Sequence, residues 1–219
     1  RKLPLVYVDL PSPGDASSVT MDDEGGARKA AEHVLSLGHR RVGIITVGLG
    51  PLVRVVDRRQ ASATSGAGAY VAAQRLAGWS EALLAAGVEP VIIAQPSLQA
   101  DARPAARALL QIEPRPTAVL CFSDTIARDV VTQAHDLGLS VPDDVSVAGF
   151  DDAPFAARLR PALTTVHQDL DAKGRAAVAA LREAIERRRR NIPVAGARIA
   201  LPTRLVVRES TGPAPRRPR

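Results

Sequence analysis

Cysteine and aromatic residues are scarce in this sequence: it contains one cysteine, Cys121, and aromatic residues make up 3% of the chain. Because a single cysteine cannot form an internal disulfide, a reducing, cytoplasmic setting is the simplest expectation. With so few aromatic side chains, the core must consist mainly of Ala, Val, Leu and Ile. No apolar run approaches the roughly 18 residues that a membrane-spanning helix needs. The first residues contain neither a Met nor the apolar segment of a signal peptide, so we expect a piece of a longer protein.

The formal net charge of +6 suggests nucleic-acid binding, but its distribution argues against a base-reading surface. Residues 187–190 are four arginines, and Arg216, Arg217 and Arg219 add three more, which leaves the rest of the chain at about −1 (6 minus 7). A surface that reads DNA spreads its basic residues along an element that faces a groove. Cations also suit the C-terminal end of a helix. We therefore expect residues 187–190 to be a solvated helix end and residues 213–219 to be a disordered tail.

Short apolar runs alternate with helical segments along the chain. The predicted strands are residues 5–8, 18–21, 42–47, 91–94, 118–122, 145–150, 163–166, 199–201 and 205–207. The predicted helices are residues 25–37, 71–86, 102–111, 124–137 and 172–190, and a mobile loop is expected at residues 58–68. Strands that alternate with helices of about ten or more residues indicate βαβ units, a mostly parallel sheet and right-handed connections. The predicted fold class is therefore α/β.

Sequence motifs for catalysis and cofactor binding are missing. Gly48 and Gly50 could open a dinucleotide-binding turn, but Val53 stands where the third glycine belongs. No P-loop occurs, and none of the four histidines lies in a nucleophile or metal-ligand motif. Cys121 lies among apolar residues and is expected to be a core residue. We therefore expect neither an enzyme nor a site for a cofactor or metal ion.

Polar side chains follow several of the predicted strands directly. In an open parallel sheet, ligands bind beyond the carboxyl ends of the strands. Carboxylates and amides there are suited to bidentate hydrogen bonds with vicinal hydroxyl groups. Two purely structural roles stay open, since Asp124 could cap its helix and Asp152 could begin a turn. The strand-end residues are Asp9, Ser123, Asp124, Asp151, Asp152 and Gln168.

Arg75 is unusual because it lies early in a helix whose other members look like packing residues. A cation near a helix N-terminus opposes the helix dipole, so another interaction must favour it there. Its guanidinium offers five donors in a rigid fork, which suits hydroxyls, carboxylates or phosphate. Arg75 is therefore a candidate binding residue, and a solvated or structurally paired arginine is the alternative.

Several segments, in order along almost the whole chain, resemble the LacI/GalR family of bacterial transcription repressors. The segment around Arg75 is similar to the family's arginine helix, and the stretch VPDDVSVAGFDD carries the strongest likeness. The similar segments are Ser18–Ala27, Leu37–Ile45, Arg75–Trp79, Val141–Asp152, Pro161–Gln168, Leu201–Thr203 and Leu205–Gly212.

This resemblance implies a periplasmic-binding-protein type I fold, in which two Rossmann-like lobes with parallel sheets close on a small molecule. It implies that residues 1–40 are part of the N-terminal lobe, that residues 41–162 are the C-terminal lobe, and that residues 163–212 are a crossover with a closing helix and strands. The family's helix-turn-helix head would lie outside this chain, and the expected partners are operator DNA, a second copy in a homodimer and an effector. The implied effector contacts are Asp9, Arg75, Ser123, Asp124, Asp151 and Gln168.

Three residues depart from the family pattern. Val71 stands where sugar-binding relatives often present a polar side chain, and Arg128 and Arg158 lie where a dimer face is expected. The expected effector is a sugar or a related metabolite, and whether it induces or co-represses stays open. A solute-binding protein that delivers a sugar to a transporter is the main alternative, because it shares this fold.

Overall fold

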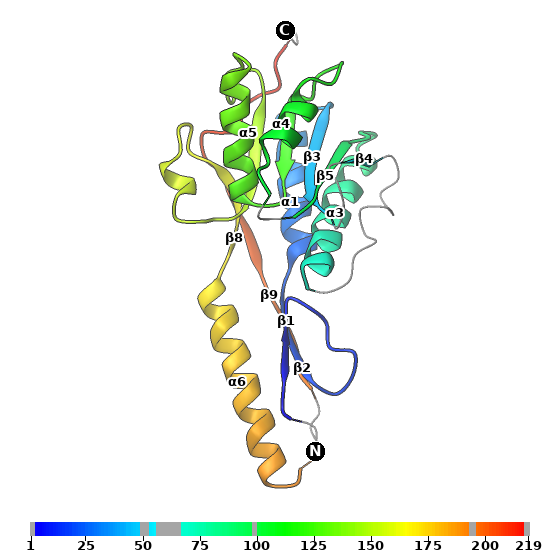
Figure 1. Ribbon diagram of the computed structural model, residues 1–219, viewed down its shortest axis with the longest axis vertical. Coiled ribbons are helices and arrows are strands. Elements are labelled where there is room, and N and C mark those ends of the chain that lie inside the picture. The colour runs from blue at the N-terminus through cyan, green and yellow to red at the C-terminus, as the bar shows by residue number, and fades with distance from the viewer. Residues whose placement is uncertain (1–2, 49–52, 56–66, 98–99, 193–195, 217–219) are drawn as a thin grey trace.

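The computed structural model describes residues 3–48, 53–55, 67–97, 100–192 and 196–216. Within these residues the strands form two sheets, one of seven strands and one of three. Figure 1 shows an elongated molecule, with the larger sheet and its helices at the broad end. The smaller sheet and the long helix α6 (Leu170–Arg189) form the narrow end.

The larger sheet has the strand order β10-β8-β7-β6-β3-β5-β4. Its five inner strands run parallel, and the edge strands β4 and β10 are antiparallel to their neighbours. The inner strand β3 is an almost continuous run of apolar residues, as expected for a strand with both faces covered. The strands are β3 (Val42–Val47), β4 (Val53–Val55), β5 (Val91–Gln95), β6 (Ala118–Cys121), β7 (Ser146–Asp151), β8 (Thr164–Gln168) and β10 (Thr203–Val206).

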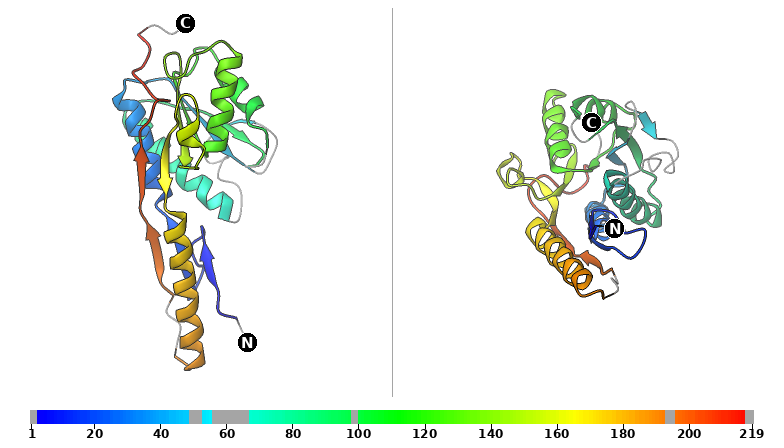
Figure 2. Two further views of the ribbon diagram at one scale, coloured as in Figure 1. Left: turned by 90° about the vertical axis from the view of Figure 1, so that its left-hand side faces the viewer. Right: turned by 60° about the horizontal axis from the view of Figure 1, so that its bottom comes forward.

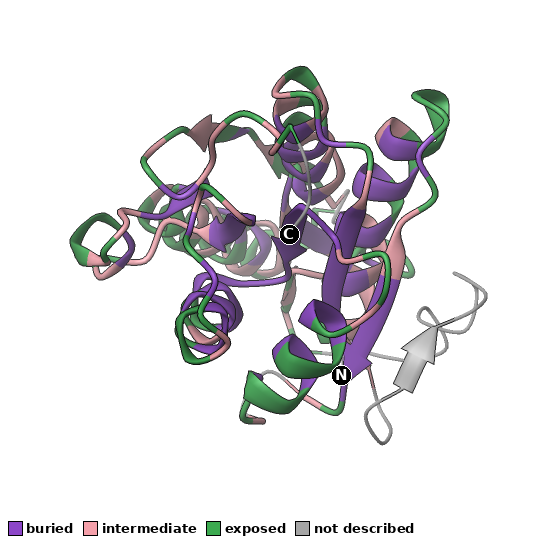
Figure 3. Cartoon of the chain, turned by 90° about the horizontal axis from the view of Figure 1, so that it is seen from above, coloured by how far each residue is buried: buried purple, intermediate pink, exposed green. Residues whose placement is uncertain are grey.

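Two pairs of helices cover this sheet, and Figure 3 shows the buried strands between them. Helices α1 (Asp23–Ser36) and α3 (Ala67–Ala85) pack against each other on one face, and α4 (Arg103–Leu110) and α5 (Asp124–Asp136) do so on the other. The backbones of α1 and α3 approach closely at Gly78, where an added Cβ would lie 2.1 Å from the carbonyl oxygen of Glu24. Small residues on the facing surfaces therefore make this packing possible.

The smaller sheet consists of β1 (Val6–Val8), β2 (Ser17–Met21) and β9 (Arg198–Leu201), all parallel and in that order. In the described residues the chain passes between the two sheets three times, from β2 to α1, from β8 to α6 and from β9 to β10. Figures 1 and 2 show these connections at a narrow waist. Two of them are joined there, because the Asp22 amide donates to the Leu201 carbonyl at 2.8 Å and the Thr203 hydroxyl donates to the Asp22 carbonyl at 2.9 Å.

The α/β class and the parallel sheets predicted from the sequence are confirmed, and every predicted strand and helix occurs with its ends shifted by a few residues. The short strand β4 was not predicted. Most of the expected loop at residues 58–68 lies outside the described residues, and its last two positions begin α3.

Three contacts differ from the expected division of the chain. Helix α1 packs with the larger sheet instead of the N-terminal strands, because its buried face of Ala and Val meets α3 and β8. Strand β9 pairs with β2, so only β10 adds a C-terminal strand to the larger sheet. The tail is ordered up to Arg216, and the Ala214 amide donates to the Leu37 carbonyl at 2.8 Å. Residues 217–219 lie outside the described part of the chain.

Candidate functional site

The polar strand-end residues of the larger sheet lie at the edge where its parallel strands end. The chain leaves β3 in one direction to reach β5 and then returns past β3 to form β6, β7 and β8. This reversal places a topological switch point between β3 and β6, and ligands of open α/β sheets bind outside the carboxyl ends of the strands at such a point. The fold alone therefore makes this edge the candidate site.

Arg75 joins three elements at this edge. Its Nε donates to Asp23 Oδ1 at 2.8 Å, its Nη2 donates to Asp151 Oδ1 at 3.2 Å, and its Nη1 donates to the Phe122 carbonyl. The guanidinium also lies over the Phe150 ring, 3.7 Å from the ring centroid, which adds a cation–π contact. Only 4% of Arg75 is exposed, so the arginine is structurally paired, as the alternative interpretation allowed, and it also lies at the candidate site.

Asp23 is the partner of Arg75 that the sequence interpretation missed as a site residue. Its side chain is 2% exposed, in the first turn of α1. Burial raises the pKa of this carboxyl, and the nearby charge and hydrogen bond of Arg75 counteract that rise. Asp22 is the residue that caps α1, by accepting from the Gly25 amide at 3.0 Å. The sequence did contain a sign of this role. One carboxylate is enough to cap a helix, so the second aspartate of the Asp22–Asp23 pair was available for another interaction.

Asp151 and Gln168 lie together at the ends of β7 and β8. The Gln168 amide Nε2 donates to Asp151 Oδ1 at 2.7 Å, so this oxygen accepts from both Gln168 and Arg75. Asp151 has a positive φ of 111°, which is rare for a residue with a side chain and indicates local strain. Burial raises the pKa of Asp151, and Arg75 opposes that rise. About 36% of the Asp151 side chain remains exposed, so it can be reached by a ligand.

Ser123 and Asp124 hold the start of α5. The Ser123 hydroxyl caps the helix by accepting from the Ile126 amide at 3.3 Å, so Ser123 and not Asp124 is the cap. Asp124 Oδ1 accepts from the Thr165 hydroxyl at 2.5 Å, and Oδ2 accepts from the Ala153 amide at 2.7 Å. Burial raises the pKa of Asp124 to about 7. Both residues therefore have structural partners at the edge of the site.

Asp152 connects β7 to β8 and to the C-terminal segment. It accepts from Arg208 at 2.6 Å and pairs with His167 Nδ1 at 2.9 Å. Burial acts to raise the pKa of Asp152, but the hydrogen bonds from Arg208 and His167 outweigh it and lower the pKa. Asp152 therefore holds the segment after β10 against the sheet through its contact with Arg208. The sequence had suggested only that Asp152 could begin a turn. Arg208 and His167 were not expected here, because nothing in their local sequence signals this contact.

Asp9 lies on the other side of the waist, at the end of β1. Lys173, in the first turns of α6, donates to both of its carboxylate oxygens at 2.9 and 3.0 Å. Asp9 is close enough for its charge to raise the pKa of Asp23, and Lys173 acts in the opposite direction. The Asp9–Lys173 pair therefore faces the Arg75 cluster without a direct hydrogen bond to it. Of the six predicted contacts, the structure joins Arg75, Asp151 and Gln168 by hydrogen bonds, and it places Ser123, Asp124 and Asp9 around them.

Within the part of the chain that the structure describes, no group of three or more His, Cys, Asp or Glu side chains is arranged to hold a metal ion. Cys121 is fully buried, and burial raises the pKa of its thiol, so it has no thiolate character. Among the described helices none is both long and apolar enough to cross a membrane.

Comparison with known proteins identifies the class to which this fold and site belong. The family described as "Periplasmic binding protein-like domain" matches residues 31–211, so the chain belongs to that family. An HTH-type transcriptional regulator of Mycolicibacterium smegmatis is 37% identical over 187 residues, which cover 81% of this chain and 50% of the relative.

Two solved structures narrow the class further. A putative transcriptional regulator of the LacI family from Sanguibacter keddieii is 36% identical, with a TM-score of 0.76, over 95% of this chain and 72% of that one. A complex of the transcriptional regulator CelR with cellobiose is 31% identical, with a TM-score of 0.74, over 94% of this chain and 58% of that one. The resemblance in the sequence is thereby confirmed: this is an effector-binding domain of the LacI type. The chain spans about half the length of the M. smegmatis relative.

Proposed function

We propose that this domain is the sensor of a cytoplasmic transcription repressor, and that it binds a small effector between the edge of the larger sheet and the end of β1. The observation that carries the proposal is the position of Asp151, which accepts hydrogen bonds from Arg75 and Gln168 at the end of β7, one strand from the switch point, and is still partly exposed. A buried guanidinium and an amide fix this carboxylate in one orientation, so it is preorganised to accept hydrogen bonds from a ligand.

The polar groups at this edge favour a ligand rich in hydroxyl groups. Carboxylates such as Asp151 and Asp9 accept hydrogen bonds from hydroxyls, and the guanidinium of Arg75 is already neutralised by two carboxylates. An anionic ligand would therefore meet excess negative charge. A neutral sugar or polyol fits better, and cellobiose in the CelR complex is a precedent in a relative.

Ligand binding at the waist would control the arrangement of the two sheets. The three connections between the sheets can act as a hinge, and an effector that contacts both sides binds one arrangement better than the other. The resulting coupling between effector and operator DNA is typically about 1–3 kcal/mol, and it is reciprocal. The DNA-reading helix-turn-helix would belong to the part of the longer relatives that this chain does not span, and the repressor would act as a homodimer.

The relatives favour a repressor over a transporter's solute-binding protein, since the M. smegmatis relative is named an HTH-type transcriptional regulator. The effector contacts that we propose are Asp9, Arg75, Ser123, Asp124, Asp151 and Gln168, and Asp23 and Lys173 act through Arg75 and Asp9.

A thermal-shift screen of the chain against cellobiose, glucose, polyols, nucleosides and sugar phosphates tests this proposal. Gln168→Ala removes an amide that is 6% exposed at the site, and Gln133→Ala removes an equally buried amide near the other end of α5. We expect neutral sugars or polyols to raise the melting temperature of wild type and Gln133→Ala but not of Gln168→Ala. A response confined to sugar phosphates, or an equal response in both variants, would contradict the proposed site.

A further inference from the structure

The narrow end of the molecule carries a run of basic residues at the end of helix α6. Helix α6 ends there in Arg187, Arg188 and Arg189, and Arg190 follows as its C-terminal cap. The N-terminal end of the chain lies at the same end, as Figure 1 shows, and Leu3 lines one hollow together with Arg188 and Arg189. We call Arg188, Arg189 and Arg190 the basic tip.

The basic tip has no acidic partner in the described residues. Arg187 is paired, because its Nε donates to Glu183 at 2.9 Å, but no ion pair involves Arg188, Arg189 or Arg190 there. Residues 191–195, which follow the basic tip in the sequence, contain no acidic residue. Residues 182–190 carry five arginines and two glutamates, so this end of α6 has a net positive charge.

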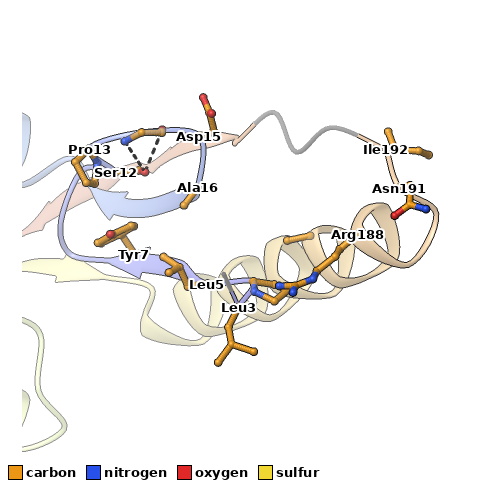
Figure 4. Close-up of a pocket in the computed structure, with 13 residues that line it drawn as sticks. Leu3, Leu5, Tyr7, Ser12, Pro13, Asp15, Ala16, Arg188, Asn191 and Ile192 are labelled. Atoms are coloured by element: carbon orange, nitrogen blue, oxygen red, sulfur yellow. Dashed lines mark hydrogen bonds between the residues drawn. The ribbon is translucent and has the colours of Figure 1, made fainter. Parts of the chain in front are cut away.

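Burial and packing do not explain these arginines. Arg189 and Arg190 are exposed, and Arg188 extends from α6 toward β1, as Figure 4 shows, beside an open hollow of about 790 Å³. A helix C-terminus favours a cation, but the effect is weak and confined to the last turn. That preference accounts for one or two cations, whereas each further arginine is repelled by its neighbours. A polyanion would relieve this repulsion.

We infer that the basic tip contacts the phosphate backbone of double-stranded DNA without reading its bases. The inference rests on the proposed function, in which a neighbouring domain holds the protein on DNA. Contacts to phosphates need no side chain aimed into a groove, so the clustered arrangement that argues against base reading is compatible with them. Arginine is also the side chain best suited to bidentate contacts with phosphate.

The test measures binding of the 219-residue chain to a fluorescent 20-base-pair duplex of arbitrary sequence, by anisotropy between 50 and 200 mM salt. One variant changes Arg188, Arg189 and Arg190 to Gln. The matched control changes Arg216, Arg217 and Arg219 to Gln, which removes the same charge from the C-terminal end of the sequence. Circular dichroism checks that both variants are folded.

Three phosphate contacts contribute about 2.7 to the slope of log affinity against log salt. Wild type and the control should therefore lose about 40-fold more affinity across this salt range than the tip variant. Equal losses in the two variants would show that only net charge matters, and absence of binding by wild type at 50 mM salt would also overturn the inference. Tighter binding to anionic lipid vesicles or to RNA of the same length than to the duplex would assign the tip to another partner.

The same two variants separate this inference from the proposed effector site. The tip variant should keep the melting-temperature response to effector, because the basic tip lies at the far end of α6 from the waist. Loss of DNA binding with an intact effector response supports the basic tip as a separate surface. An effector response that disappears in the tip variant would contradict this separation, whereas a missing response in wild type would count against the proposed function alone.

Discussion

Replacing Arg75 by Met should destabilise the domain strongly, because the guanidinium compensates charge that cannot reach water. The change leaves Asp23, which is 2% exposed, without its ion-pair partner, and it removes donors to Asp151 and to the Phe122 carbonyl. Breaking a buried ion pair by removing one partner typically costs 3–5 kcal/mol. We therefore expect a loss of about 3–5 kcal/mol in the free energy of unfolding at pH 7.

Urea unfolding followed by tryptophan fluorescence measures this loss, since Trp79 is the single tryptophan of the chain and is 1% exposed. The matched control is Arg128→Met, which removes a guanidinium that is 47% exposed and paired with its neighbour Asp129. A surface pair of this kind contributes about 0–1 kcal/mol. The control should therefore change the urea concentration at the midpoint of unfolding only slightly.

The pH dependence gives a second check on the reasoning. Burial already raises the pKa of Asp23 and Asp151, and without Arg75 both values should rise further. A carboxyl whose pKa is raised in the folded state loses stability as the pH rises, because the unfolded chain releases its proton first. The cost of Arg75→Met should therefore shrink as the pH falls from 7 toward 5, and adding Asp23→Asn should recover at least 1 kcal/mol at pH 7. A cost below about 1 kcal/mol that does not vary with pH would refute the assignment of Arg75 as the charge partner.

Two further stability predictions follow from the site and the helix packing. Burial raises the pKa of Asp124 to about 7, so this carboxyl should make the folded protein less stable as the pH rises from about 4 to about 7. Urea unfolding at pH 5 and pH 8 measures this effect, and the free energy of unfolding should depend less on pH in Asp124→Asn than in wild type. An equal pH dependence in the two proteins would contradict the raised pKa. Gly78→Ala should destabilise by at least about 1–3 kcal/mol because its Cβ would collide with the Glu24 carbonyl. Gly68→Ala, in the same helix with nothing within 4 Å of the added Cβ, should be neutral or slightly stabilising, and equal effects would argue against close packing of α1 on α3.

The fold was largely predictable because the inner strands of the larger sheet are almost entirely buried and therefore have a distinctive apolar composition. The segment from Val42 to Val47 is a strand in the sequence pattern and in the structure, and the polar residues that follow β6, β7 and β8 meet at one edge. The rule that parallel strands end together was sufficient for that step. The edge that carries the candidate site could therefore be located from the sequence pattern, and the effector contacts there stay a prediction.

What the sequence could not provide are contacts between segments far apart in the chain. Lys173 lies 164 positions from Asp9, and Arg208 lies 56 positions from Asp152, yet each pair is joined by hydrogen bonds. Helix α1 was assigned to the wrong side of the waist for a related reason, because an amphipathic pattern shows that a face is buried but not what covers it. Asp23 was overlooked because a helix start already explains an acidic residue there.

The most direct test of the proposed site is isothermal titration calorimetry with the neutral sugar or polyol that raises the melting temperature most, comparing wild type with Asp151→Asn. The account predicts one binding site per chain in wild type. It predicts a loss of affinity of at least about tenfold in the variant, because a hydrogen bond to a charged group contributes about 1.5–3 kcal/mol. Equal affinity in the two proteins would show that the ligand binds elsewhere and would contradict the assignment of this edge as the effector site.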